Sequence, residues 1–217
     1  MEFFKSKIGP LEVICSLFCL TMITSTLLFR SNSKPVTDST STLYTTEMYQ
    51  EHTELRYYTA KNKLSDAIDE YIQQVAPAST MNGLAFIKQC DKYDVDIRFV
   101  LAQAQLESCF ATTGLGGKMN SAFNIGAFDG EGSKYMKKHK HPDLSIEDFL
   151  KLLTTKYLTD GKTETDLLNN YVDNYNHRYA SNPEYETILF DIYTSICSSP
   201  ITAVYNDYKK YKILADK

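Results

Sequence analysis

The sequence is marked first by what it lacks. Its 217 residues include no tryptophan and no Cys-x-x-Cys pair, so a structural zinc site is not expected. It contains no Gly-rich phosphate-binding loop, Ser-His-Asp pattern or Cys-His pairing, which removes the usual motifs of nucleotide binding and of serine or cysteine hydrolases. The net charge of −4 gives no general attraction to nucleic acid or to anionic lipid. We therefore expect no metal, no cofactor and no nucleic-acid partner.

The five cysteines do not define a disulfide framework. Cys15 and Cys19 lie in an apolar N-terminal segment, whereas Cys90, Cys109 and Cys197 lie in the later part of the chain. Because three is an odd number, complete pairing within the later part is excluded. Buried free thiols are the simplest interpretation, and disulfides among these three remain open.

The N-terminal region differs in composition from the rest. Residues 13–29, VICSLFCLTMITSTLLF, carry no charge and are about as long as the shortest membrane-spanning helices. We interpret residues 1–30 as a membrane anchor with a single transmembrane helix; a cleaved signal peptide is the alternative. Residues 31–58 are rich in Ser and Thr and poor in aliphatic side chains, so we predict a flexible tether, with a partly helical stretch at 48–58 left open.

Residues 59–200 are predicted to form one mainly helical domain, followed by a C-terminal helix or tail at 201–217. Apolar residues recur at helical spacing through most of this domain. Residues 111–133 interrupt the pattern with six of the nine glycines, which predicts a Gly-rich loop or a small hairpin.

Polar residues and proline indicate where several of the helices begin. Ser79 or Thr80 is expected to cap the helix with an apolar stripe at 84–90, and Asp96 is expected to cap the helix predicted at 97–110. Apolar residues at helical spacing predict a further helix that reaches Tyr175, and Asn182-Pro183 predicts a late helix that starts at Pro183.

Glu107 is the strongest candidate for catalysis. It lies near the end of a helix predicted at 97–110, on the same face as Val100 and Ala104. Desolvation of a carboxyl group on such a face raises its pKa, and a glycosidase needs a carboxylic acid that can donate a proton near neutral pH. An acid at a helix end can also simply tilt into solvent, so this feature alone does not assign a function.

Three motifs resemble the endo-β-N-acetylglucosaminidase domain of bacterial autolysins, flagellar muramidases and phage lysins. AQAQLES at residues 102–108 resembles the family's Ala-Gln-Ala-x-Leu-Glu-Ser helix. NSAFNI at 120–125 resembles its Asn-x-x-Phe-Gly-Ile loop, and YASNPEY at 179–185 resembles the Tyr-Ala-Thr-Asp-Pro-x-Tyr segment that opens a late helix. The three occur in the family's order, which makes the resemblance fairly specific.

The resemblance implies a lysozyme-like α+β fold, cleavage of the glycan strands of peptidoglycan, and Glu107 as general acid. It also implies that Tyr179 lies near the cleaved bond and stabilises positive charge at the anomeric carbon; a Tyr packed under the late helix is the alternative. The motif residues implied to bind substrate are Gln103, Asn120, Phe123 and Asn124, although a loop Phe can equally anchor in the core.

The sequence departs from the family's pattern at two motifs. Cys109-Phe110 replaces the common Trp-Gly, and Asn124 replaces the loop glycine. The stretch that carries a second acid in the family is also short here, and the second catalytic group is undefined. An inverting enzyme needs another carboxylate about 6.5–9.5 Å from the acid, and the candidates are Asp129, Glu131 and Asp143. Alternatively, the N-acetyl group of the substrate acts as the nucleophile.

Three functions remain open at this stage. The first is a glucosaminidase, the second a lytic transglycosylase that forms 1,6-anhydro sugars, and the third a catalytically weakened wall-binding or virion structural protein. The expected partners are peptidoglycan, the membrane, and envelope or virion components. We expect the domain to face the wall in the periplasm or at the cell surface, or to belong to a virion; the sequence does not distinguish a bacterial from a phage source.

Overall fold

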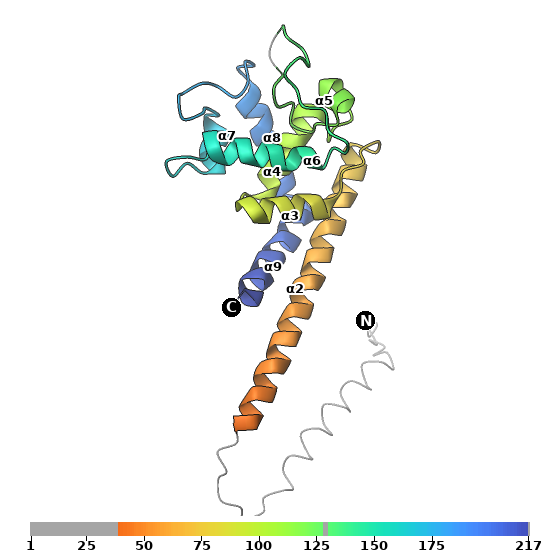
Figure 1. Cartoon of the computed structure of the whole chain (residues 1–217), viewed down its shortest axis with the longest axis vertical. Helices are drawn as coiled ribbons and strands as arrows, with labels where there is room; N and C mark the ends of the chain where they lie inside the picture. The colour runs from red at the N-terminus through yellow and green to blue at the C-terminus, as the bar shows by residue number, and fades with distance from the viewer. Residues whose placement is uncertain (1–38, 128–129, 217) are drawn as a thin grey trace, which may run out of the picture. The chain divides into compact units, whose positions relative to one another are not determined.

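A computed structural model of the chain describes residues 39–127 and 130–216 (Figure 1). The expected anchor at 13–29 and the start of the expected tether lie outside these ranges. The helices, in chain order, are α2 (Ser39–Val75), α3 (Gly83–Tyr93), α4 (Ile97–Ser108), α5 (Gly114–Met119), α6 (Leu144–Leu152), the π-helix η1 (Leu153–Tyr157), α7 (Glu164–Asn169), α8 (Tyr185–Cys197) and α9 (Pro200–Ala215).

The prediction of a mainly helical fold is confirmed, but the expected β component is missing from the described ranges. No β-strand occurs in residues 39–127 or 130–216. The Gly-rich stretch at 111–133 contains the short helix α5 and a series of turns where a hairpin was considered. One isolated antiparallel bridge joins Val172 to Arg178 and closes a tight turn.

A long helix replaces most of the expected tether. α2 includes residues 39–58, so the helical stretch left open at 48–58 is present, and the helix begins earlier, at Ser39, where a flexible tether was expected. No proline or glycine interrupts this stretch, and adding turns to an existing helix costs little. Packing also holds it: Thr53 is buried, Tyr57 lies beside Tyr208 of α9 with ring centroids 5.7 Å apart, and Leu64 is fully buried in the core.

α4 runs through the core and packs against α3, α5 and α8. Every residue from Phe99 to Ala104 is buried. Asp96 caps the helix as predicted, because its side chain accepts a hydrogen bond of 2.9 Å from the Arg98 amide. The last turn of this buried helix carries Glu107, so the position of the candidate acid is fixed by the core itself.

α3 begins after a different cap from the one predicted. Ser79 or Thr80 was expected to cap it, but the cap is Asn82, whose Oδ1 accepts the Ala85 amide at 3.0 Å. Ser79 instead donates its hydroxyl to the Phe110 carbonyl at 2.9 Å. The Ser79 side chain, which local spacing predicted as a cap, therefore makes a long-range contact instead.

The helix predicted to reach Tyr175 ends earlier. α7 stops at Asn169, and Tyr171 is buried in the core while Tyr175 is 74% exposed. The chain leaves the helix because the bridge at Val172 and the side chain of Asp173 take over the local backbone hydrogen bonds. This turn at 172–178 becomes one wall of the cleft described below.

The last two helices follow directly on one another. Asn182 accepts the Glu184 amide at 3.0 Å, and α8 begins at the next residue, slightly later than its predicted start at Pro183. Ser199 caps α9 through the Ile201 amide. Among the described helices, none alone has the length and apolar character needed to cross a membrane, and α8 with α9, bent by 72°, meets that test only as a pair.

Candidate active site

The chain leaves α4 through an unusual backbone immediately after Glu107. Cys109, Phe110 and Ala111 have φ values of 48°, 55° and 62°, a left-handed conformation that non-glycine residues rarely adopt. Burial of Phe110, whose ring meets those of Tyr71 and Phe86, stabilises this exit. The strained turn directs the following loop back across the end of α4.

Glu107 is desolvated and hydrogen-bonded at the end of α4. The Tyr185 hydroxyl donates to Glu107 Oε1, and Gln103 Nε2 in turn donates to the Tyr185 oxygen at 2.6 Å. Desolvation raises the pKa of Glu107 to about 6, while hydrogen bonds from Tyr185 and Asn124 act in the opposite direction. The predicted rise in the pKa of this acid is confirmed by its environment.

Glu107 opens into a cleft of about 620 Å³. One wall comes from the loop at 123–127, and the other from η1 and the segment 173–181. The lining residues include Glu107, Asn124, Tyr157, Asp173 and Tyr179. The cleft is thus formed by segments far apart in sequence around the end of one buried helix, which is the arrangement of a ligand site.

Four tyrosines form an aromatic cluster beside the acid: Tyr157, Tyr171, Tyr179 and Tyr185. Tyr179 stacks on Tyr171 with centroids 4.4 Å apart, and Tyr157 meets both rings edge-on. Burial and the nearby Glu107 carboxyl raise the pKa of Tyr179 well above its ordinary value. Its hydroxyl therefore stays protonated, and it donates to the Phe123 carbonyl at 3.2 Å. Tyr179 is both a packed residue and part of the cleft wall.

The motif loop places only one of its predicted residues directly at Glu107. Asn124 lines the cleft and donates its Nδ2 to the Glu107 carbonyl at 2.6 Å. The Phe123 ring is fully buried and stacks on Phe149 with centroids 4.2 Å apart, so the core alternative describes its side chain. Asn120 turns away from the cleft and donates to the His139 carbonyl.

Gln103 also has a different place from the one implied. Its side chain is fully buried behind Tyr185 and does not line the cleft. We therefore correct the assignments of Gln103 and Asn120 as substrate-binding residues: the former supports Tyr185, and the latter supports the loop.

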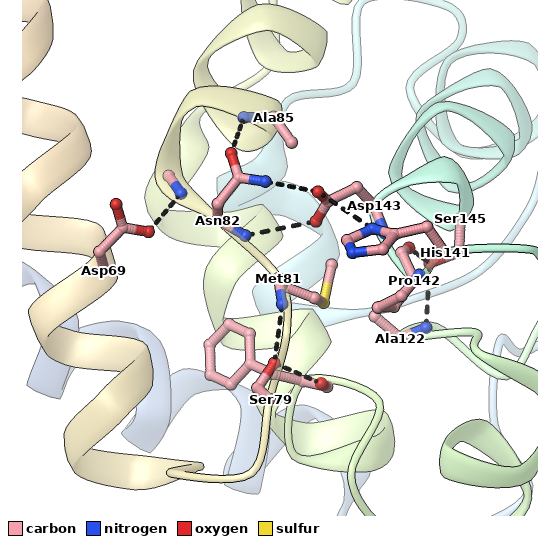
Figure 2. A network of polar contacts seen from close by, with 12 residues as sticks. Asp69, Ser79, Met81, Asn82, Ala85, Ala122, His141, Pro142, Asp143 and Ser145 are labelled. Atoms are coloured by element: carbon pink, nitrogen blue, oxygen red, sulfur yellow. Dashed lines mark hydrogen bonds and ion pairs between the residues drawn. The ribbon is translucent and has the colours of Figure 1, made fainter.

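The structure does not bring the described candidates for a second acid to the cleft. Asp143 precedes α6, and Figure 2 shows its carboxylate facing Asn82 at the start of α3. Glu131 forms an exposed ion pair with Lys134 at 2.8 Å. Asp129 lies outside the described residues. The carboxylate that does share the cleft with Glu107 is Asp173, which the motif comparison did not single out.

Sequence reasoning missed several cleft residues. Tyr185 is the last residue of the third motif, which contains a Tyr at each end. Its place in the motif could have identified it as a hydrogen-bond partner of Glu107. Asp173, Arg178 and Lys156 had no such signal, because they belong to a π-helical turn and a non-helical turn that periodicity does not describe.

Residues 39–127 and 130–216 contain no cluster of three or more His, Cys, Asp or Glu side chains suited to a metal ion. Cys90, Cys109 and Cys197 are free thiols. Cys109, two residues after the candidate acid, donates its thiol to the Val75 carbonyl at 3.3 Å and so joins α4 to the end of α2.

One comparison with known proteins matches the part of the chain that forms this cleft. A family model named Glucosaminidase, and described as mannosyl-glycoprotein endo-beta-N-acetylglucosaminidase, matches residues 83–198. That range contains Glu107, the motif loop and all four tyrosines of the cluster. A search of curated proteins gives no match to the chain. Because the family model matches more than half of the sequence and includes the cleft, the chain belongs to the glucosaminidase family.

Proposed function

We propose that the protein is an endo-β-N-acetylglucosaminidase that hydrolyses the glycan strands of peptidoglycan. The observation that carries this proposal is the state of Glu107, a desolvated acid with a pKa of about 6 that opens into a cleft of about 620 Å³. Family membership supports glycosidase chemistry in general. The peptidoglycan substrate and the roles of individual residues are our proposal.

Glu107 acts as the general acid that protonates the leaving glycosidic oxygen. Tyr185 occupies Glu107 Oε1, so we assign the transferred proton to Oε2. Gln103 holds the Tyr185 hydroxyl from the buried side and thereby fixes its direction. Because only the protonated acid can donate, the rate should fall as the pH rises through the pKa of Glu107.

Two groups in the cleft suit the positive charge that develops at the anomeric carbon. Tyr179 presents a neutral phenol whose proton is directed to the Phe123 carbonyl, which leaves its oxygen lone pairs available to a cationic centre. Hydrogen bonds from the backbone and side chain of His177 and from the Tyr175 amide lower the pKa of Asp173, so it adds a negative charge.

Asp173 and the substrate's own N-acetyl group are the two routes we propose for the second step. Asp173 would activate water as a base, whereas the N-acetyl group would attack the anomeric carbon from within the substrate. An Asp173→Asn variant distinguishes the routes: a loss of rate close to that of a Glu107 variant supports the base, and a small loss supports the substrate-assisted reaction.

We also propose that residues 1–30 hold the domain at a membrane with the cleft facing the wall, at a cell surface, in a periplasm or in a virion. The uncharged run at 13–29 supports this arrangement. A glycosidase for wall polymer has to lie on the same side of the membrane as its substrate.

The proposal is tested by incubating the full-length chain with purified peptidoglycan and identifying released fragments by mass spectrometry. Glu107→Gln removes the proton donor, and Glu147→Gln, an exposed acid paired with Lys92, is the matched control. We expect fragments with reducing N-acetylglucosamine ends from the wild type and the control, and none from Glu107→Gln. Anhydro ends would identify a transglycosylase, and an absence of fragments from all three proteins would leave a wall-binding role.

A further inference from the structure

The cleft carries charge on the side away from the motif loop. Lys156 of η1, and Asp173 and Arg178 of the turn at 172–178, all line it. Backbone contact holds the two elements together, because the Asn174 amide donates to the Lys156 carbonyl at 2.9 Å. These side chains are therefore presented by one connected wall.

Partners within the protein already engage two of the three charges. The Asp173 carboxylate accepts hydrogen bonds from the Tyr175 amide at 2.9 Å and from the His177 amide at 2.8 Å, and its other oxygen lies 3.2 Å from His177 Nδ1. Arg178 forms an ion pair with Glu186. Both side chains are thus held in place by the turn and by α8.

Lys156 differs from both. It is exposed, and within the part of the chain that the structure describes, no carboxylate lies at ion-pair distance from its ammonium group. It also lies within the π-helical turn η1, a local irregularity of a kind that often occurs at functional sites. The cleft wall therefore presents an uncompensated cation, with the Arg178 guanidinium on the same wall.

We propose that Lys156 binds a carboxylate of the acidic peptide stem carried by the glycan strand, and so selects peptide-bearing peptidoglycan over neutral N-acetylglucosamine polymers. This inference rests on the proposed function and specifies the substrate of the same cleft. The sugars themselves offer only neutral hydroxyl and acetamido groups, whereas stem peptides carry free carboxylates beside the bond to be cut. A lysine ammonium on a flexible stem suits such a mobile anionic group, which needs charge more than a fixed geometry.

The contact should act on substrate binding. An exposed ion pair contributes little, about 0.2–1 kcal/mol, which corresponds to about a two- to fivefold change in kcat/KM at the upper part of that range. Because the stem takes no part in breaking the glycosidic bond, the contact is equally strong before and during the reaction, and we expect the change in KM with kcat preserved.

The experiment compares two preparations of soluble glycan strands with stem peptides, one native and one with its carboxylates converted to amides. The full-length wild type should cleave the native strands about two- to fivefold more efficiently than the amidated ones. Lys156→Met should lose this preference by a rise in KM on native strands alone, and Lys156→Arg should keep it. Lys151→Met removes an exposed lysine of α6 that does not line the cleft, and it should behave as the wild type.

Two results would overturn the inference while leaving the proposed function in place: a wild type that cleaves both preparations equally, or a Lys156→Met variant that retains the preference. A Lys156→Met variant that loses rate equally on both substrates would indicate a structural role and would also overturn it. If the wild type cleaves neither preparation, the proposed function itself fails, and the selectivity for stems fails with it.

Discussion

Two carboxylic acids of this protein, Glu107 and Asp143, both have a raised pKa, but they differ in their hydrogen-bond partners and in their access to the cleft. Desolvation raises the pKa of both. Glu107 receives the Tyr185 hydroxyl on one carboxyl oxygen and lines a cleft. Asp143 receives the Asn82 amide on one oxygen and the Asn82 side chain on the other, and His141 Nδ1 lies 3.3 Å away (Figure 2).

The difference shows that burial alone does not create a proton donor. The Asp143 carboxylate connects the start of α6 to the start of α3, where Asn82 also caps the helix and Asp69 of α2 accepts the Gly83 amide at 2.7 Å. Its oxygens are committed to folding contacts. Glu107 can still contact a substrate. Its surroundings desolvate the carboxyl group and provide one hydrogen-bond donor, the Tyr185 hydroxyl, but they leave the carboxyl group open to the cleft.

Removal of the Glu107 carboxyl group should cause the largest loss of activity. It should also increase stability relative to the wild type as the pH rises. General acid catalysis contributes about 10²–10⁴-fold, so Glu107→Gln should lower kcat by about this factor. The folded-state pKa of about 6 lies above 4.5, the ordinary pKa of a glutamate, so the wild type loses stability as the pH rises from about 4.5 to about 6.

The stability side of this prediction is measurable by urea unfolding. The rise in the pKa of Glu107 from 4.5 to about 6 corresponds to about 2 kcal/mol in the free energy of unfolding. The free energy of unfolding of Glu107→Gln should therefore rise relative to that of the wild type by about 2 kcal/mol between pH 4 and pH 7. A difference that stays constant with pH would contradict a raised pKa at Glu107.

The loop geometry at Glu107 is tested by Gly116→Ala. A Cβ at Gly116 would lie 2.4 Å from the Ser108 Cβ and 2.9 Å from Asn124 Oδ1, so the loop would have to move away from the acid. Small displacements of catalytic groups are costly, and we expect a loss of about tenfold in kcat. Gly117→Ala is the control, because its new Cβ would meet Thr112 at 3.0 Å and not Asn124. Equal losses in the two variants would argue against a role of this contact.

Helical periodicity and the sequence motifs predicted only part of the fold and of the cleft. Periodicity located α4 and α8, and the motif at 102–108 identified Glu107, because a buried helix face imposes a regular pattern on its own residues. The helix through 39–58 was left open only at 48–58 and was not expected before it, since its Ser and Thr content resembles that of a tether and its packing on α9 is a tertiary contact.

The cleft residues outside the motifs were missed for a related reason. Asp173 and Lys156 reach the cleft through a tight turn and a π-helical turn, neither of which has a repeating sequence signature. Asp143 illustrates the opposite error. It was a candidate for the second acid, but the hydrogen bonds of Asn82 direct its carboxylate to another part of the fold.

A smaller effect is expected from Tyr185→Phe, which changes the acid without removing it. The Tyr185 hydroxyl lowers the pKa of Glu107, so its loss should raise that pKa and move the alkaline limb of the pH-rate profile to higher pH. Tyr193→Phe, which removes a hydroxyl farther along α8 that contacts Asp96, is the control and should leave the limb in place. A limb that moves to lower pH would contradict the assigned hydrogen bond.

Asp143→Asn should have the smallest effect on activity and a clear effect on stability. Whichever way the new amide is oriented, its NH₂ faces one of the two Asn82 donors, so one of these hydrogen bonds is lost. We expect the free energy of unfolding at neutral pH to fall by about 0.5–1.5 kcal/mol, while kcat changes by less than about twofold. Unfolding curves and initial rates on the same preparations provide both numbers. A loss of activity approaching that of Glu107→Gln, without loss of stability, would make Asp143 a participant in the reaction and remove the contrast between the two acids.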